Sequence, residues 1–136
     1  MKHLLIPIDG SECSIQAVTA IKQIFPPSHA DVTLLTVRED VDSNSTVILN
    51  QMIKDTMPVL DKAASLLLEY NVNKVVDFGI AGNTILRYAK QHNIDIIIIT
   101  KRTHSALSVF LGSVAVHLVK YGHCPVIVLP ENHYEL

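Results

Sequence analysis

The 136-residue chain is poor in aromatic residues, which make up 5% of it, and it contains no tryptophan. Its hydrophobic residues, 49% of the chain, are therefore largely isoleucine, leucine and valine. An aliphatic interior of this kind is typical of a parallel β-sheet covered by helices on both faces. The length fits one unit with its own core, so we expect residues 1–136 to form a single domain.

The chain also has few cysteines and a small net charge. Cys13 and Cys124 are the only cysteines, which argues against a secreted disulfide scaffold and favours reduced thiols. The net charge is −2, whereas domains that bind nucleic acid electrostatically are usually basic. The densest apolar run, 94–99, contains Asp95 and is too short to span a bilayer. We expect a cytoplasmic protein that binds neither nucleic acid nor membrane.

Several standard sequence signatures of nucleotide binding, metal binding and catalysis are missing. The sequence has no G-x-x-x-x-G-K-[ST] phosphate loop, no G-x-G-x-x-G after its first apolar run and no G-x-S-x-G elbow. The seven histidines lack metal-ligand spacing, and His117 and His123 are better explained as structural residues. Cys124 precedes Pro125 at the start of an apolar run, which favours burial over reactivity. We expect neither an enzyme nor a metal site.

Short apolar runs alternate with helical patterns along the chain. The expected strands are 4–8, 32–37, 74–78, 94–100 and 125–130, and the expected helices lie between them. The longest helix, from about 46 to 70, contains Pro58, which should kink or restart it, and 71–73 should form a turn. Ile48 and Leu68 are expected on its inner face, and the last helix is expected to bear Val114, Leu118 and Val119. The alternation predicts an α/β fold with a parallel, doubly wound sheet.

Ligands of open parallel sheets bind beyond the carboxyl ends of the strands. The candidates at these ends are Pro7, Asp9, Val37, Gly79 with 80–83, and Thr100. Asp9 suits both a sugar-binding carboxylate and a turn residue. Gly112 and Ser113 suit both an anion site at a helix start and an ordinary helix cap. Lys101 and Arg102, on the loop before them, could add positive charge near a phosphate.

Five segments, in order along the chain, carry a family resemblance. They are Leu4-Leu5-Ile6-Pro7-Ile8-Asp9-Gly10-Ser11-Glu12, Leu34-Leu35-Thr36-Val37, Gly79-Ile80-Ala81-Gly82, Leu111-Gly112-Ser113-Val114 and His123-Cys124-Pro125-Val126-Ile127-Val128. Over essentially its whole length the chain resembles the universal stress protein family. The resemblance implies a five-stranded, Rossmann-like sheet in the order 3-2-1-4-5. It also implies a homodimer through antiparallel pairing of the last strands, here Val126, Ile127, Val128 and Leu129.

Some members of that family bind ATP through a glycine, two residues, a second glycine, nine residues and then Gly-Ser or Gly-Thr. The resemblance implies that Asp9 contacts the ribose and that the backbone of Val37 holds adenine. It further implies that Gly112, Ser113 and Val114 hold the phosphates.

The first two glycines of that pattern are absent here. Counting back from Gly112 places Ile99 and Arg102 at their positions, or Thr100 and Thr103 if the loop is one residue shorter. Each replacement restricts the backbone where it should wrap the phosphates. The threonine hydroxyls and the two loop cations could compensate in part.

Two functions remain open. The first is a regulatory protein that binds an adenine nucleotide, ATP or AMP, with or without Mg²⁺. The second is a dimeric interaction module of the same family that binds no nucleotide. A dedicated ATPase is not expected, because the sequence shows no general base poised for hydrolysis and no Walker-type magnesium site.

Overall fold

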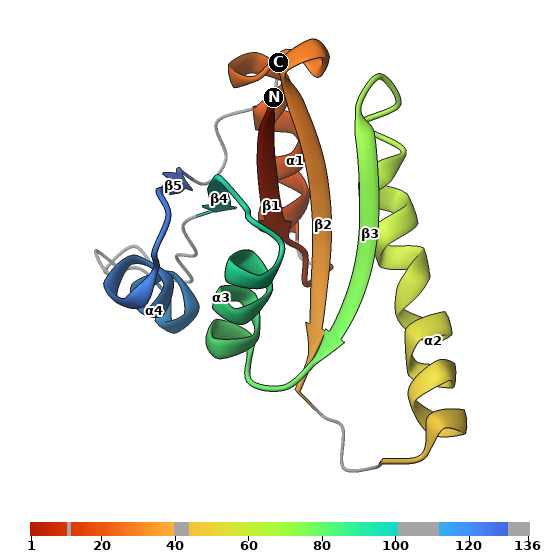
Figure 1. The fold of residues 1–136 in the computed structure, drawn as a ribbon. Helices are drawn as coiled ribbons and strands as arrows, with labels where there is room; N and C mark the ends of the chain where they lie inside the picture. Colours follow the sequence, from red (N-terminus) through yellow and green to blue (C-terminus); the bar gives the residue numbers. More distant parts are fainter. Residues whose placement is uncertain (11, 40–43, 101–111, 131–136) are drawn as a thin grey trace.

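The computed structural model describes residues 1–10, 12–39, 44–100 and 112–130. Strands and helices alternate along them as the sequence predicts (Figure 1). The elements are β1 (Lys2–Pro7), α1 (Glu12–Ile24), the 3₁₀ turn η1 (Pro27–His29), β2 (Ala30–Arg38), α2 (Thr46–Ala64), β3 (Asn71–Phe78), α3 (Ala81–Gln91), β4 (Ile96–Thr100), α4 (Ser113–Tyr121) and β5 (Val126–Leu129).

The strands form one parallel sheet in the order β3-β2-β1-β4-β5, which confirms the predicted topology. From β1 the chain builds outward to β3 on one side, and then returns to add β4 and β5 on the other. The strand order therefore reverses between β1 and β4. Parallel strands bring their carboxyl ends to one edge of the sheet, so this reversal marks the expected place for a ligand.

Helices cover both faces of the sheet, since alternate residues of a strand point to opposite faces. In β1, Leu4 and Ile6 belong to the core beneath α1 and α2, whereas Leu5 belongs to the core beneath α3 and α4. Figure 1 shows the two helix pairs on opposite sides of the sheet. This arrangement explains why the central strands are apolar throughout rather than alternating with polar residues.

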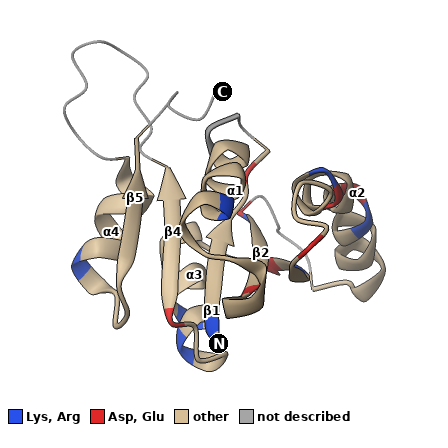
Figure 2. Cartoon of the chain, turned by 90° about the horizontal axis from the view of Figure 1, so that it is seen from above, with Lys and Arg blue, Asp and Glu red and all other residues tan. Residues whose placement is uncertain are grey.

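Figure 2 shows that the positions of lysine, arginine, aspartate and glutamate are spread over several of the described helices and strands. Lys74 Nζ lies 2.7 Å from Asp61 Oδ1 and links β3 to α2. Arg87 Nη2 lies 3.6 Å from Asp77 Oδ2 and links α3 to β3. In the part of the chain that the structure covers, none of the helices is both long enough and apolar enough to cross a membrane.

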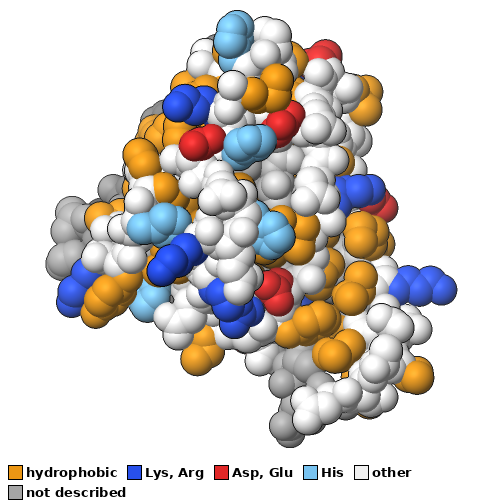
Figure 3. Space-filling model, viewed as in Figure 1, with side chains coloured by type: hydrophobic (Ala, Val, Ile, Leu, Met, Phe, Trp, Pro, Cys, Tyr) orange, Lys and Arg blue, Asp and Glu red, His pale blue; other side chains and the backbone are white. Residues whose placement is uncertain are grey.

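The longest helix differs from its prediction. α2 runs without interruption through Pro58, so the expected restart there is wrong. Pro58 is exposed, and water can hydrate the carbonyl oxygen that loses its N–H partner. Ile48 and Leu68, expected to face inward, are 47% and 82% exposed, because Ile48 lies near the outer end of α2 and Leu68 lies beyond its last turn. Figure 3 shows hydrophobic side chains on the surface toward the lower right, on the side of the molecule where α2 lies.

The expected turn at 71–73 also needs correction. Asn71 and Asn73 are not in a turn, since both pair with β2 in the sheet. β2 begins at Ala30, earlier than expected. Its additional residues provide backbone partners, so β3 can begin at Asn71. Val119 is 55% exposed because α4 turns its buried face to α3 and β5 through Ala115 and Leu118.

Candidate functional site

The turn after β1 is held against β2. The N–H of Ile8 donates to the carbonyl oxygen of Leu35 at 2.8 Å, and Thr36 Oγ1 donates to the carbonyl oxygen of Ile8 at 2.7 Å. Gly10 follows with a φ of 86°, a conformation that favours glycine. These contacts place Asp9 at the carboxyl edge of the sheet, where it is exposed.

A glycine also makes the turn between β3 and α3. Gly79 has a φ of 140°, and a Cβ at this position would lie 2.6 Å from Thr84 Oγ1. The Gly79 N–H donates to the carbonyl oxygen of Arg38 at 3.0 Å. The start of α3 is therefore fixed beside the end of β2, next to the half-buried Val37.

Thr100 ends β4 with a buried hydroxyl. Its Oγ1 has no hydrogen-bond partner among the residues that the structure describes. A buried polar atom without a partner costs about 1–3 kcal/mol, so such atoms are rare unless something else satisfies them. The position is one of the predicted site residues, beside the reversal of strand order.

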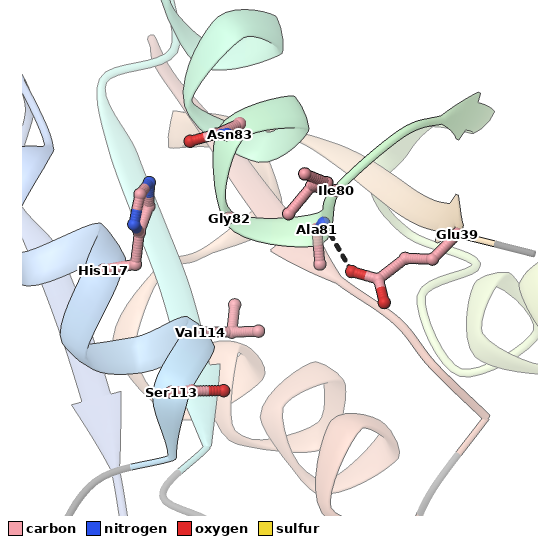
Figure 4. A pocket seen from close by; sticks show the side chains of 8 residues that line it. All are labelled: Glu39, Ile80, Ala81, Gly82, Asn83, Ser113, Val114 and His117. Atoms are coloured by element: carbon pink, nitrogen blue, oxygen red, sulfur yellow. Dashed lines mark hydrogen bonds between the residues drawn. The ribbon is translucent and has the colours of Figure 1, made fainter.

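A pocket of about 230 Å³ opens between α3 and α4 (Figure 4). Its lining residues are Glu39, Ile80, Ala81, Gly82, Asn83, Ser113, Val114 and His117. Ala81 and Ser113 are the first residues of α3 and α4. The amino-terminal ends of two helices, where backbone N–H groups lack partners within the helix, therefore meet at one cavity.

The wall between the two helices is tightly packed. A Cβ on Gly82 would lie 2.7 Å from Cδ2 of His117, so the absence of a side chain at Gly82 lets the imidazole lie across α3. The same ring stacks at a tilt on Tyr121, with 4.9 Å between ring centroids. His117 is thereby held on the pocket side of α4, as Figure 4 shows.

The predicted site residues that the structure describes lie at the same edge of the sheet, but only some of them line the pocket. Ser113 and Val114 line it, and Gly112 directly precedes them as the N-cap of α4. Pro7, Asp9, Val37, Gly79 and Thr100 lie at strand ends and are not in its lining. Lys101, Arg102 and Thr103 lie outside the described residues.

Sequence reasoning missed two residues that line the pocket, Glu39 and His117. Both had a detectable signal. Glu39 directly follows β2, so it has the kind of strand-end position that singled out Asp9. His117 lies four residues after Ser113 on α4, and this spacing places two side chains on one helix face.

The thiol of Cys124 is not suited to chemistry at neutral pH. Burial, and secondarily the nearby carboxylate of Asp95, raise the pKa of this thiol above its ordinary value. The protonated thiol is a poor nucleophile, since the thiolate is the reactive form. The residue is half-buried rather than fully buried, and the raised pKa of its thiol agrees with the expectation that it is not reactive.

Known proteins resemble this chain over nearly its full length. The universal stress protein MJ0531 of Methanocaldococcus jannaschii is 27% identical over 98% of this chain and 85% of its own. The universal stress protein YxiE of Bacillus subtilis is 27% identical over 93% of this chain and 97% of its own. The solved structure of the hypothetical protein MJ0577 has a TM-score of 0.79 and 24% identity, and the alignment covers 97% of both chains.

Three more distant structures contain nucleotides. They are a universal stress protein in complex with cAMP, one from Archaeoglobus fulgidus in complex with dAMP and a family protein from Arabidopsis thaliana with AMP bound. Their TM-scores are 0.74, 0.71 and 0.68, at identities of 16%, 14% and 14%, and the alignments cover 93–97% of each chain. At identities this low, the structural similarity shows only that this chain shares their fold. The model of the universal stress protein family matches residues 1–130, and the chain belongs to this family.

Proposed function

We propose that the protein binds an adenine nucleotide, AMP or ATP with or without Mg²⁺, at the carboxyl edge of its sheet. Its role is then regulatory rather than catalytic, and its location is the cytoplasm. The observation that carries the proposal is the pocket between the starts of α3 and α4, which Ser113 and Val114 line. The bound cAMP, dAMP and AMP of the three distant structures support the ligand class.

The chemistry of the edge suits the parts of such a ligand. The amide groups at the start of α4 and the hydroxyl of Ser113 can donate hydrogen bonds to a phosphate. The carboxylate of Asp9 can accept hydrogen bonds from ribose hydroxyls, and the backbone at Val37 can pair with an adenine edge. The buried hydroxyl of Thr100 would gain the partner that the described residues do not provide.

Isothermal calorimetry with ATP, ADP and AMP, in the presence and absence of Mg²⁺, tests the proposal. The wild-type protein should bind at least one of them. Asp9→Ala should weaken that binding by about tenfold to a hundredfold, the usual effect of losing hydrogen bonds to a charged group. Asp55→Ala, which removes an exposed carboxylate on α2, is the control. Absence of binding to all three nucleotides would reject the proposal.

Self-association is a second part of the proposal. β5 is at one edge of the sheet and pairs only with β4 among the described strands. Exposed apolar strand edges favour pairing with another chain. We propose a homodimer in which Val126, Ile127, Val128 and Leu129 pair with the same strand of a second copy. If nucleotide binding fails its test, this dimer is the basis of the alternative function, an interaction module.

A further inference from the structure

Glu39 makes an unusual contact at the pocket. It follows β2, and its Oε1 accepts a hydrogen bond from the N–H of Ala81 at 2.7 Å (Figure 4). Ala81 is the first residue of α3, and the preceding Ile80 makes no side-chain cap. A carboxylate from the end of β2 therefore satisfies an amide at the start of α3 and offsets the partial positive charge there.

The two helix starts at the pocket consequently differ. α4 begins after Gly112, which has no side chain to act as a cap, and its first turn contains no acidic residue. The start of α3 holds a carboxylate, whereas that of α4 receives none from its own cap or first turn. The described lining of the pocket includes no lysine or arginine that could neutralise Glu39.

We infer that Glu39 is a specificity-determining residue, which directs the phosphate of a bound nucleotide to α4 and selects against additional phosphates. The inference rests on the proposed function. The carboxylate repels a phosphate from the α3 end of the pocket, while its oxygen atoms can still accept hydrogen bonds from a neutral nucleoside. The ligand class that fits best is a nucleoside monophosphate.

The size of the pocket allows an estimate of how much the Glu39 carboxylate weakens the binding of a phosphate. Glu39 and Ser113 line the same cavity of about 230 Å³. A compact cavity of that volume is less than about 10 Å across, so we take the separation of the carboxylate from a phosphate at α4 to be on the order of the Debye length. At such a separation a like charge weakens binding by about threefold to fivefold at physiological ionic strength. ATP carries more negative charge than AMP and should lose more affinity.

The test is a series of ligands of increasing charge: adenosine, AMP, ADP and ATP. Their affinities are measured by calorimetry in magnesium-free buffer for the wild-type protein and for Glu39→Gln. Glutamine keeps a side-chain oxygen that can accept the Ala81 N–H, so α3 stays capped while the charge is removed. Asp55→Asn removes one charge from the exposed face of α2 and serves as the matched control.

In Glu39→Gln we expect adenosine to bind within about twofold of wild type, AMP about threefold tighter and ATP about tenfold tighter. Asp55→Asn should leave the ratio of ATP to AMP affinity unchanged. An equal ratio in Glu39→Gln and wild type would show the inference about Glu39 to be wrong and leave the proposed function standing.

Inorganic tripolyphosphate separates the two remaining outcomes. If no nucleotide or nucleoside binds to either protein, the proposed function is wrong. Binding of tripolyphosphate to Glu39→Gln but not to wild type would then support charge exclusion by Glu39 alone. Absence of tripolyphosphate binding to both proteins would overturn the inference together with the proposed function.

Discussion

Two threonine hydroxyl groups in this protein differ in their hydrogen bonding and therefore in their expected effect on stability. Thr100 Oγ1 is buried and has no partner in the described part of the chain, whereas Thr36 Oγ1 donates to the carbonyl oxygen of Ile8. We predict that Thr100→Val raises the free energy of unfolding by about 1 kcal/mol without ligand, because valine has the same shape and removes an unpaired polar atom. Urea denaturation measures this change.

The same variant should weaken the proposed nucleotide binding, since the hydroxyl is then no longer available to the ligand. Thr36→Val is the matched control, and it should lower the free energy of unfolding by about 1–2 kcal/mol because it leaves the carbonyl of Ile8 without its hydrogen bond. A loss of stability in Thr100→Val would mean that its hydroxyl is satisfied in the free protein.

At the scale of residues, the sequence could predict positions but not distances. Ser113 and Val114 were found because Gly112 and a following helical pattern mark a helix start, and they do line the pocket. Glu39 and His117 have local signals, a strand-end position and a helical spacing from Ser113, but their contacts at the pocket depend on α3 lying beside the end of β2 and beside α4. Such contacts join residues far apart in the chain, and no local pattern contains them.

The packing of α3 on α4 depends on one glycine. A Cβ on Gly82 would lie 2.7 Å from Cδ2 and 3.3 Å from Cβ of His117. We predict that Gly82→Ala lowers the free energy of unfolding by about 1–3 kcal/mol, because the imidazole and α4 must move to relieve the overlap. Urea denaturation followed by circular dichroism measures it.

A double variant shows whether the imidazole is the cause. In the background of His117→Ala, the cost of Gly82→Ala should fall to within about 0.5 kcal/mol, since the clashing atoms are absent. Asn83 is the exposed neighbour of Gly82, and Asn83→Ala should change the free energy of unfolding by less than about 0.5 kcal/mol. An undiminished cost in the double variant would place the strain in the backbone of α3 instead.

The type and order of the elements were predictable, whereas several boundaries were not. β-branched and aliphatic runs identify strands because these side chains fit a sheet buried on both faces. Asn71 and Asn73 have low strand propensity, yet pairing with β2 keeps them in β3. Pro58 is a strong helix breaker, yet α2 continues through it, because packing against the sheet on both sides of the proline outweighs one lost hydrogen bond.

At the scale of the molecule, one topology positions the whole candidate site. The order β3-β2-β1-β4-β5 brings the ends of β1, β2 and β4 to one edge and leaves β3 and β5 at the sides. The alternation of elements predicts the parallel sheet, but the strand order came from the family resemblance, because alternation alone permits more than one order. The ligand edge and the β5 edge are separate surfaces, so binding and self-association can be tested independently.

The hydrogen bonding of β5 allows a sharp test of the proposed dimer. The N–H of Ile97 donates to the carbonyl oxygen of Pro125, and Ile97 is the partner of Val126. In a parallel ladder with this register, the N–H of Ile127 points to β4 and that of Val128 points to the free edge. Val128→Pro therefore removes an outward donor and keeps the bonds to β4.

We predict that the wild-type protein sediments at twice the 15.0 kDa of one chain, and that Val128→Pro sediments as a single chain with its circular dichroism spectrum preserved. Ile127→Pro is the control, because it removes a donor to β4 and should destabilise the fold itself. Sedimentation velocity measures all three proteins. A monomeric wild type would reject the proposed dimer. A Val128→Pro dimer as tight as the wild type would exclude pairing through β5 and place the self-association on another surface.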